Sequence, residues 1–283
     1  MILSGKSRIA GVLGWPVSHS RSPRLQNHWL ERYEIDGAYI PLPVRPESFA
    51  SAVTTLASLG FCGANVTVPH KEAALRVCDE VTSSARRIGA VNTLFFEEGR
   101  ILGDNTDAYG FIQNLFEGCS QWQATAGPAV VLGAGGAARA LCVALLDAGA
   151  PEIRLVNRTK ERADRLADSL RQNGDGAQLE IGVWGDWDKV CADANLLVNA
   201  TSLGMTGQPA LGIDLSALPT TALVNDIVYT PLETELLATA RQRGNRVVDG
   251  LGMLLHQAVP GFSRWFGQTP DVDEDLRRFV LEA

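Results

Sequence analysis

The pattern of hydrophobic and polar residues changes partway along the chain. In the first part, short runs rich in β-branched and aromatic residues alternate with segments of helical spacing. The runs that predict strands are RIAGVLG (8–14), AYIPLPV (38–44) and ANVTVP (64–69). Between the last two, Phe49, Val53 and Leu56 follow the spacing of a helix within 46–60. This alternation predicts a sheet with helices on both faces.

The segment VNTLFFEEGRILGDN (91–105) predicts a β-hairpin, because two apolar runs flank Glu98-Gly99, a pair typical of tight turns. Strands of a hairpin are antiparallel, whereas strands joined by helices are usually parallel. We therefore expect the sheet of the first domain to be mixed.

The second part of the chain has a more regular alternation. Apolar runs that predict strands begin near residues 129, 153, 178, 196, 222 and 246. Helical patterns lie between them, notably at 136–148, 159–173 and 231–243. Nearly continuous apolar strands separated by helices predict a Rossmann-like, doubly wound parallel sheet. The stretch QWQATAG (121–127) is a candidate linker ahead of this second domain.

Composition and charge narrow the class of protein. The net charge of −7 and the pI of about 5.2 argue against nucleic acid as a partner. Five cysteines without a CxxC pair suit a reducing cytoplasm, and neither they nor the four histidines have the spacing of metal ligands. The apolar stretch 129–150 contains a glycine cluster, Arg139 and Asp147, so we expect no membrane span. The expected protein is cytoplasmic, acts on a small molecule and is a monomer or homodimer.

The string AVVLGAGGAARAL carries a glycine-rich turn between a predicted strand and a predicted helix. Gly133 permits the tight turn, Gly135 lets backbone approach a pyrophosphate, and Ala138 is small enough for close helix packing. Backbone N–H groups at the helix start would hold the anion. A tight turn without a ligand is the alternative, but the strand–turn–helix context favours a dinucleotide site.

The residues after the next strand favour NADP over NAD. An NAD site usually has an acidic residue there, whereas this chain has Asn157, Arg158 and Thr159, followed by Arg162. A guanidinium group suits a 2′-phosphate. Arginines on the surface of a helix capped by Thr159 are the alternative. The loop VNATSLGM (198–205) ends a further strand and could pass under a nicotinamide, or could be only a turn.

The string GANVTVPHK (63–71) puts a lysine in an unusual place. Pro69 ends the predicted strand and is able to open a helix as its first residue. Lys71 then lies in the first helical turn, where the helix dipole disfavours a cation. Lys71 therefore needs a partner or a chemical role.

Several strings together resemble the shikimate dehydrogenase family, which also includes quinate dehydrogenases, over nearly the whole chain. They are GWPVSHSRSP (14–23), GANVTVPHK (63–71), GAVNTL (89–94), GDNTDAYG (103–110), GAGGAAR (133–139), NRT (157–159), NATSLGM (199–205) and DGLGMLLHQA (249–258). The resemblance implies a reversible, NADPH-dependent reduction of 3-dehydroshikimate to shikimate in aromatic amino-acid biosynthesis. It also implies a discontinuous substrate domain (1–110 and 245–283), an NADP domain (111–244) and an active site in the cleft between them.

The resemblance assigns roles to polar residues of the substrate site. The implied substrate-binding residues are Ser20, Ser22, Asn65, Thr67, Lys71, Asn92, Thr106, Asp107, Tyr229 and Gln257. Ser20 and Ser22 would hold the carboxylate, and a Ser-x-Ser pair favours shikimate over quinate. Lys71 and Asp107 form the implied catalytic pair. An ammonium group can stabilise and protonate the alkoxide left by hydride transfer, while the carboxylate holds the lysine and accepts a substrate hydroxyl.

The expected cofactor site combines the glycine turn, the arginine segment and two later loops. Its residues are Gly133, Ala134, Gly135, Gly136, Ala137, Asn157, Arg158, Thr159, Arg162, Ala200, Thr201, Ser202, Gly250 and Met253.

Structural alternatives accompany the main assignments. Ser22 could be a helix N-cap, and Thr106 or Asp107 could cap the helix that follows. Lys71 could be an ordinary surface residue. His70 could be a second acid–base group, but we expect it to be a packing residue.

Three other functions are also compatible with parts of the sequence. A family member could use quinate, or both substrates, with NAD. A binding or regulatory protein would keep the NADP fold but would be expected to have lost the catalytic pair, whereas Lys71 and Asp107 are both present here. A methyltransferase would use a glycine-rich turn but would leave Arg158 and the serine pair without a purpose.

Overall fold

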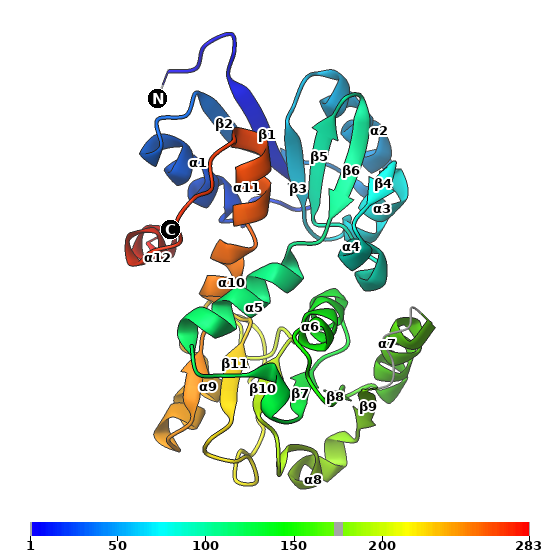
Figure 1. Ribbon diagram of the computed structural model, residues 1–283, viewed down its shortest axis with the longest axis vertical. Helices are drawn as coiled ribbons and strands as arrows, with labels where there is room; N and C mark the ends of the chain where they lie inside the picture. The colour runs from blue at the N-terminus through cyan, green and yellow to red at the C-terminus, as the bar shows by residue number, and fades with distance from the viewer. Residues whose placement is uncertain (1, 173–177, 283) are drawn as a thin grey trace. The chain divides into compact units, whose positions relative to one another are not determined.

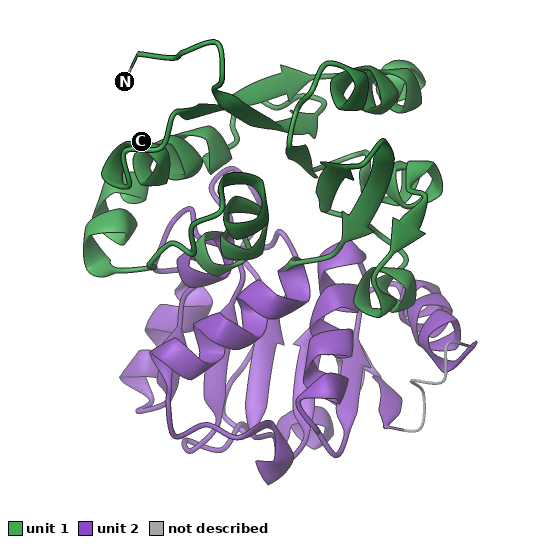
Figure 2. Cartoon of the chain, turned by 45° about the horizontal axis from the view of Figure 1, so that its top comes forward, with its two compact units in different colours: residues 1–106, 255–283 green, residues 107–254 purple. Residues whose placement is uncertain are grey.

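The computed structural model describes residues 2–172 and 178–282 of the chain. It divides into two compact units, shown in Figure 1 and coloured separately in Figure 2. Unit 1 comprises residues 1–106 and 255–283, and unit 2 comprises residues 107–254. Within the described ranges, no helix combines the length and apolar character needed to cross a membrane.

The described part of unit 1 is built on a six-stranded sheet with the order β2-β1-β3-β5-β6-β4. Its strands are β1 (Arg8–Gly14), β2 (Gly37–Pro43), β3 (Gly63–Val66), β4 (Glu80–Val81), β5 (Thr93–Glu97) and β6 (Arg100–Asp104). β1 pairs in parallel with β2 and β3, whereas β5 is antiparallel to β3 and β6. The mixed sheet is therefore confirmed. The β5–β6 hairpin turns at Glu98 and Gly99, whose φ angles of 51° and 76° suit a tight turn.

Helices cover both faces of the unit 1 sheet. On one face, α2 (Phe49–Ser58) follows the short 3-10 helix η1 (Pro46–Ser48) and buries Phe49 with Leu13 of β1. On the other, α1 (Ser22–Arg32) and α11 (Val259–Phe266) contact β1, and Gly63 lets Trp265 of α11 approach. The remaining helices of this unit are α3 (Lys71–Val77), α4 (Ser83–Ile88) and α12 (Glu274–Leu281).

The described part of unit 2 contains a six-stranded sheet in which every pairing is parallel, with the order β12-β11-β10-β7-β8-β9. Its strands are β7 (Ala129–Leu132), β8 (Ile153–Val156), β9 (Leu179–Gly182), β10 (Leu196–Asn199), β11 (Leu223–Asp226) and β12 (Arg246–Val248). Read from β9, the strands follow the 3-2-1-4-5-6 order of a doubly wound dinucleotide-binding sheet. The Rossmann-like prediction is confirmed.

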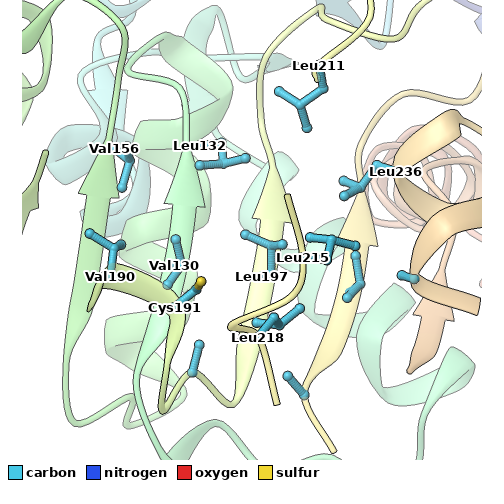
Figure 3. Packing of buried hydrophobic residues seen from close by; sticks show 14 of the residues in the cluster. Val130, Leu132, Val156, Val190, Cys191, Leu197, Leu211, Leu215, Leu218 and Leu236 are labelled. Carbon is cyan, nitrogen blue, oxygen red and sulfur yellow. The ribbon is translucent and has the colours of Figure 1, made fainter. Parts of the chain in front are cut away.

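Helices and a long loop enclose the core of unit 2. The helices are α5 (Asp107–Gly118), α6 (Gly136–Asp147), α7 (Lys160–Gln172), α8 (Trp187–Cys191) and α9 (Glu235–Gln242), with 3-10 helices η2 (Ala124–Ala126) and η3 (Trp184–Asp186). A further helix, α10 (Leu251–His256), begins in unit 2 and ends in unit 1. Figure 3 shows the apolar cluster that helices and the long loop of unit 2 form with the sheet. It contains Leu132 and Leu197 of the sheet, Cys191 of α8, Leu236 of α9 and Leu215 of the long loop between β10 and β11. Burial of this apolar cluster holds the strand ends that carry the candidate cofactor residues in place.

Two predicted helix starts are wrong. The helix expected at 231–243 begins only at Glu235, because the Thr234 side chain caps it by accepting the Leu237 N–H. Pro69 does not open α3. The His70 N–H donates to the Thr67 carbonyl oxygen at 2.9 Å in a turn before the helix, and Lys71 is the first helical residue.

The candidate linker is also wrong, because residues 121–127 are packed into unit 2. Trp122 and Ala124 are only 6% and 5% exposed. The small and polar residues of this segment suggested a linker, but the indole ring of Trp122 has enough apolar area to pack the segment against unit 2. The helix predicted at 159–173 corresponds to α7, and its predicted last residue lies outside the described residues.

Candidate active site

Ser20 and Ser22 lie side by side where the chain enters α1. The Ser22 N–H donates to Ser20 Oγ at 3.3 Å. Ser22 is the first residue of α1, and the N-cap position before it is Arg21, which makes no side-chain capping bond. The alternative that Ser22 is the N-cap is therefore wrong. Its hydroxyl instead forms a hydrogen bond with Tyr39, a buried residue of β2.

Asn65, Asn92 and Thr106 belong to one buried hydrogen-bond network in unit 1, although they come from β3, the residue before β5 and the segment after β6. Asn92 Oδ1 accepts the Thr106 backbone N–H at 2.8 Å and the Thr106 hydroxyl at 3.2 Å. The Asn65 amide donates to the Asn92 carbonyl oxygen at 3.3 Å. The structure thus brings together three of the predicted substrate-binding residues.

Two members of this network were missed by the sequence reasoning. Thr93 Oγ1 accepts from Asn65 Nδ2 at 3.1 Å and donates to Asn92 Oδ1 at 2.9 Å. The Tyr39 hydroxyl donates to Asn65 Oδ1 at 2.6 Å. Because Thr93 directly follows the predicted site residue Asn92, its position in the sequence could have indicated that it belongs to the same network. Tyr39 had none, because it lies 26 residues from Asn65 and reads as an ordinary strand tyrosine.

Thr67 lies beside the carboxyl end of β1. Its N–H donates to the Leu13 carbonyl oxygen at 2.9 Å. A Cβ at Gly14 would lie 2.6 Å from the Thr67 methyl group, so the close approach requires glycine there. Thr67 is held at the strand end where ligands of open α/β sheets bind.

Lys71 and Asp107 both open helices. Lys71 is the first residue of α3, and its carbonyl oxygen accepts the Val91 N–H at 2.9 Å. Asp107 is the first residue of α5 and directly follows Thr106 of the unit 1 network. Lys71 belongs to unit 1 and Asp107 to unit 2, so their pairing stays a prediction.

His70 packs in the core of unit 1. It is 1% exposed, and its ring stacks on Phe49 with the centroids 4.6 Å apart. Its Nε2 lies 2.7 Å from the Val44 carbonyl oxygen. These contacts support the expected packing role over a second acid–base role. Among the residues that the structure describes, no group of three or more His, Cys, Asp or Glu side chains could hold a metal ion.

The glycine-rich turn joins β7 to α6. Gly133 has a φ of +108°, in the left-handed region, and a Cβ there would lie 3.0 Å from the Ala200 carbonyl oxygen. A Cβ at Gly135 or Gly136 would meet nothing within 4 Å, so the start of α6 leaves room for a ligand. Ala138 is fully buried where α6 packs on the sheet. The geometry of these small residues is compatible with a dinucleotide site, and their binding roles stay predictions.

The arginine segment lies next to this turn. The Gly133 N–H donates at 2.8 Å to the carbonyl of the last β8 residue, so the two loops leave the same edge of the sheet. Asn157 Nδ2 donates to the Thr159 carbonyl oxygen at 2.7 Å, which shapes the turn into α7. Arg158 and Arg162 are exposed. Their predicted contact with a 2′-phosphate stays a prediction.

A second buried network fixes the loop after β10. Asn199 Oδ1 accepts the Thr201 N–H at 3.0 Å and the Thr201 hydroxyl at 2.7 Å. Asn199 Nδ2 donates to Asp226 Oδ1 at 3.0 Å, and Asp226 Oδ2 accepts the Thr234 hydroxyl at 2.7 Å. Burial raises the pKa of the Asp226 carboxyl. Asp226 was not predicted as a site residue, although it ends β11 as Asn199 ends β10.

The last predicted residues lie around α10. Gly250 precedes this helix, and a Cβ there would come within 2.3 Å of the Ile227 carbonyl oxygen. Glycine at this position therefore allows the chain to pass close to the segment that carries Tyr229. Met253 lies within α10 and Gln257 directly after it, and both are half-buried. Their binding roles stay predictions.

The fold and the candidate site indicate a class of two-unit α/β proteins, in which a unit with a dinucleotide-binding fold is joined to a second unit with a mixed sheet. Three family models match this chain. The shikimate dehydrogenase substrate binding domain matches residues 12–94, the shikimate / quinate 5-dehydrogenase model residues 119–204, and the shikimate 5′-dehydrogenase C-terminal domain residues 250–277.

Curated relatives extend this match to the whole chain. A protein of Paramagnetospirillum magneticum named shikimate dehydrogenase (NADP(+)) is 60% identical over 99% of this chain and 100% of its own length. A protein of the same name from Rhodospirillum rubrum is 56% identical over 99% of each chain. The chain belongs to the shikimate dehydrogenase family.

Solved structures share the fold. The Thermus thermophilus shikimate 5-dehydrogenase in complex with NADP(H) and shikimate is 37% identical, with a TM-score of 0.85 over 97% of this chain and 99% of that one. The Corynebacterium glutamicum quinate dehydrogenase in complex with NAD is 32% identical, with a TM-score of 0.90 over 98% of this chain and 99% of that one.

Proposed function

We propose that this chain catalyses the reversible, NADP-dependent interconversion of shikimate and 3-dehydroshikimate, with Lys71 and Asp107 as its catalytic pair. The observation that carries the reaction is the 60% identity, over 99% of this chain and the full length of the relative, to a protein named shikimate dehydrogenase (NADP(+)). The solved relative that contains NADP(H) and shikimate supports the same pair of ligands.

The chemistry of the unit 1 network suits a polyhydroxylated ring. The network consists of hydroxyl and amide groups, and several of them are locked by internal hydrogen bonds. Because Asn92 Oδ1 faces Thr93 and Thr106, the NH₂ group of Asn92 lies on the opposite side of the amide. A fixed amide direction is what a site needs to distinguish a hydroxyl donor from an acceptor.

Unit 2 supplies the features expected for NADP. The exposed start of α6 provides backbone N–H groups for a pyrophosphate, since Gly135 and Gly136 carry no side chain that would block it. Arg158 and Arg162 match a 2′-phosphate, and no carboxylate stands at the end of β8 to repel it. Asn199 fixes the loop at Thr201 through a hydrogen bond, and this loop is the proposed contact surface for the nicotinamide ring.

The proposed chemistry assigns one role to each charged residue. NADP+ bound to unit 2 would supply the acceptor for the hydride that leaves the ring carbon carrying the reacting hydroxyl. In oxidation, the neutral amine of Lys71 accepts the hydroxyl proton, and in reduction the ammonium group stabilises the alkoxide oxygen and returns that proton. Asp107 orients Lys71 and accepts a hydrogen bond from the ring hydroxyl. Ser20 and Ser22 hold the carboxylate of the substrate.

Quinate with NAD is the second candidate, because a solved relative with a TM-score of 0.90 is a quinate dehydrogenase in complex with NAD. Two residues argue against it in this chain. Arg158 stands where an NAD site would have an acid, and Ser22 completes a Ser-x-Ser pair.

Initial rates test both candidates. Nicotinamide absorbance is followed with shikimate or quinate, each with NADP+ or NAD+. We expect shikimate with NADP+ to give the highest kcat/KM, by about tenfold or more over the other three pairs. Equal or faster oxidation of quinate with NAD+ would favour the second candidate, and no oxidation of either substrate would reject both.

A further inference from the structure

The hydroxyl of Tyr39 lies buried between two residues of the proposed substrate site. It donates to Asn65 Oδ1 at 2.6 Å and forms a hydrogen bond with the Ser22 side chain. Tyr39 is 1% exposed. Burial raises the pKa of the phenol well above its ordinary value, so the hydroxyl keeps its proton and acts as a neutral donor.

The sheet register places Tyr39 and Asn65 on the same face of the sheet, with β1 between them. In β1, Ala10 pairs with Tyr39 of β2, and Val12 pairs with Asn65 of β3. Because Ala10 and Val12 are two residues apart, all four side chains project from the same face of the sheet. Neighbouring strands are about 4.8 Å apart, so the ring has to cross β1 to reach β3. Ala10 is small enough to let it pass.

The backbone of Tyr39 is clamped by α1. Asn27 Oδ1 accepts the Tyr39 N–H at 3.0 Å, and Asn27 Nδ2 donates to the Tyr39 carbonyl oxygen at 2.7 Å. β2 is the edge strand of the sheet, so one amide side chain replaces the missing strand partner there. The helix that begins at Ser22 thereby fixes the position of the residue that bonds to Ser22.

The Tyr39 bond acts together with two others to fix the direction of the Asn65 amide. Asn65 Nδ2 donates to Thr93 Oγ1 at 3.1 Å and to the Asn92 carbonyl oxygen at 3.3 Å. Both of its N–H donors are therefore directed into the protein, while Oδ1 accepts from Tyr39. An amide oxygen has two lone pairs, so Asn65 can still accept from a ligand hydroxyl. The two bonds of Nδ2 already select this amide orientation, and the phenol adds a hydrogen bond to Oδ1, which limits how far the amide can rotate.

We propose that Tyr39 is a positioning residue for the substrate, which holds the Ser22 hydroxyl and the Asn65 amide in the orientation that a carboxylate and a ring hydroxyl require. This inference rests on the proposed function, because it takes Ser22 and Asn65 as substrate-binding residues. The rival explanation is that Tyr39 only fills the core, where its ring lies 6.0 Å from that of Trp265.

The test is Tyr39→Phe, which keeps the ring and removes only the hydroxyl. We expect the KM for shikimate to rise about tenfold, as loss of a buried hydrogen bond predicts, with the KM for NADP+ unchanged. Tyr33→Phe is the matched control, because the Tyr33 hydroxyl also makes two hydrogen bonds, both to Asp271. It should leave both constants unchanged.

Two further measurements separate positioning from packing. Ser22→Ala should also raise the KM for shikimate, and combining it with Tyr39→Phe should raise KM by less than the product of the single effects, because the two residues act as a unit. If Tyr39→Phe fails to fold, Asn27→Ala loosens the same tyrosine and should raise the KM for shikimate about two- to threefold without affecting NADP+.

The outcomes are distinct. Unchanged KM for shikimate in folded Tyr39→Phe, or in Asn27→Ala when the first variant does not fold, overturns the proposal. So does an equal rise in the KM values for shikimate and NADP+. A wild-type protein that does not oxidise shikimate would instead reject the proposed function, independently of Tyr39.

Discussion

The two units each bury a polar network at central strands of a sheet, but the networks differ in charge. In unit 1, neutral groups such as Tyr39, Asn65 and Thr93 bond to one another. In unit 2, Asn199 and Thr234 donate to the carboxylate of Asp226, which is 0% exposed. A neutral network fixes donor and acceptor directions at every pH, whereas a buried carboxyl makes its surroundings depend on protonation.

The groups that the two units offer to a ligand also differ, in a way that fits their proposed tasks. A ring with several hydroxyl groups is recognised by the direction of hydrogen bonds, which unit 1 supplies without net charge. A dinucleotide phosphate is recognised by positive charge and backbone N–H groups, which unit 2 supplies at Arg158 and the start of α6. The variants below test this division of labour, from the largest expected effect to the smallest.

Lys71→Ala should produce the largest change, a loss of kcat of about 10²- to 10⁴-fold, because it removes the group that stabilises and protonates the alkoxide. The KM for NADP+ should hardly change, since Lys71 belongs to unit 1. Steady-state rates measure both. Lys6→Ala, at an exposed position of the same unit, is the control. Unchanged kcat in Lys71→Ala would remove its catalytic role.

Arg158→Ala should raise the KM for NADP+ about 10- to 100-fold, the effect of losing a charge-assisted bond to the 2′-phosphate. The KM for NAD+, which lacks that phosphate, should stay the same. Arg165→Ala, an exposed arginine of α7, serves as the control. Equal rises for NADP+ and NAD+ would refute the assignment of Arg158 to the phosphate.

Thr93→Val should lower the free energy of unfolding by about 1–3 kcal/mol, because the same-sized side chain leaves Asn65 Nδ2 and Asn92 Oδ1 without one of their partners. Urea unfolding at neutral pH measures this. Thr54→Val removes a hydroxyl bonded to a backbone carbonyl at an exposed site of α2 and should change stability by less than about 0.5 kcal/mol. Equal effects of the two variants would show that the buried network adds nothing.

Asp226→Asn should have the smallest effect and should appear as a change in pH dependence. The folded-state pKa of Asp226 is raised by burial, so its contribution to stability is present at pH values below its unfolded pKa and is lost as the pH rises through the folded pKa. The variant should remove this decrease in unfolding curves measured at a series of pH values above about 4.

Asp193→Asn is the control with the opposite sign. Its hydrogen bond to Arg154 lowers the pKa of the Asp193 carboxyl, so its contribution is lost as the pH falls. If both variants shifted the pH profile in the same direction, the contrast between a buried carboxyl and a surface ion pair would be wrong.

The sequence predicted those features whose causes are local. The hairpin at 91–105 followed from a turn pair between two apolar runs, and the glycine turn followed from a strand, small residues and a helix in succession. NADP was favoured by Arg158 without an acidic neighbour, and the named relatives agree with that choice.

The features that could not be predicted depend on long-range register. Tyr39 and Asn65 are 26 residues apart, and they meet only because both strands pair with β1 in a particular alignment. Asp226 meets Asn199 across 27 residues for the same reason. Pro69 fits either a turn or the first position of a helix, so local preference alone could not locate the start of α3.

The most direct test of the account is a crystal structure of the protein with shikimate and NADP+ bound. We predict that Lys71 Nζ and a carboxylate oxygen of Asp107 both lie within hydrogen-bond distance of the hydroxyl on the carbon facing the nicotinamide. Lys71 and Asp107 pointing to separate surfaces, away from that hydroxyl, would contradict the proposed mechanism.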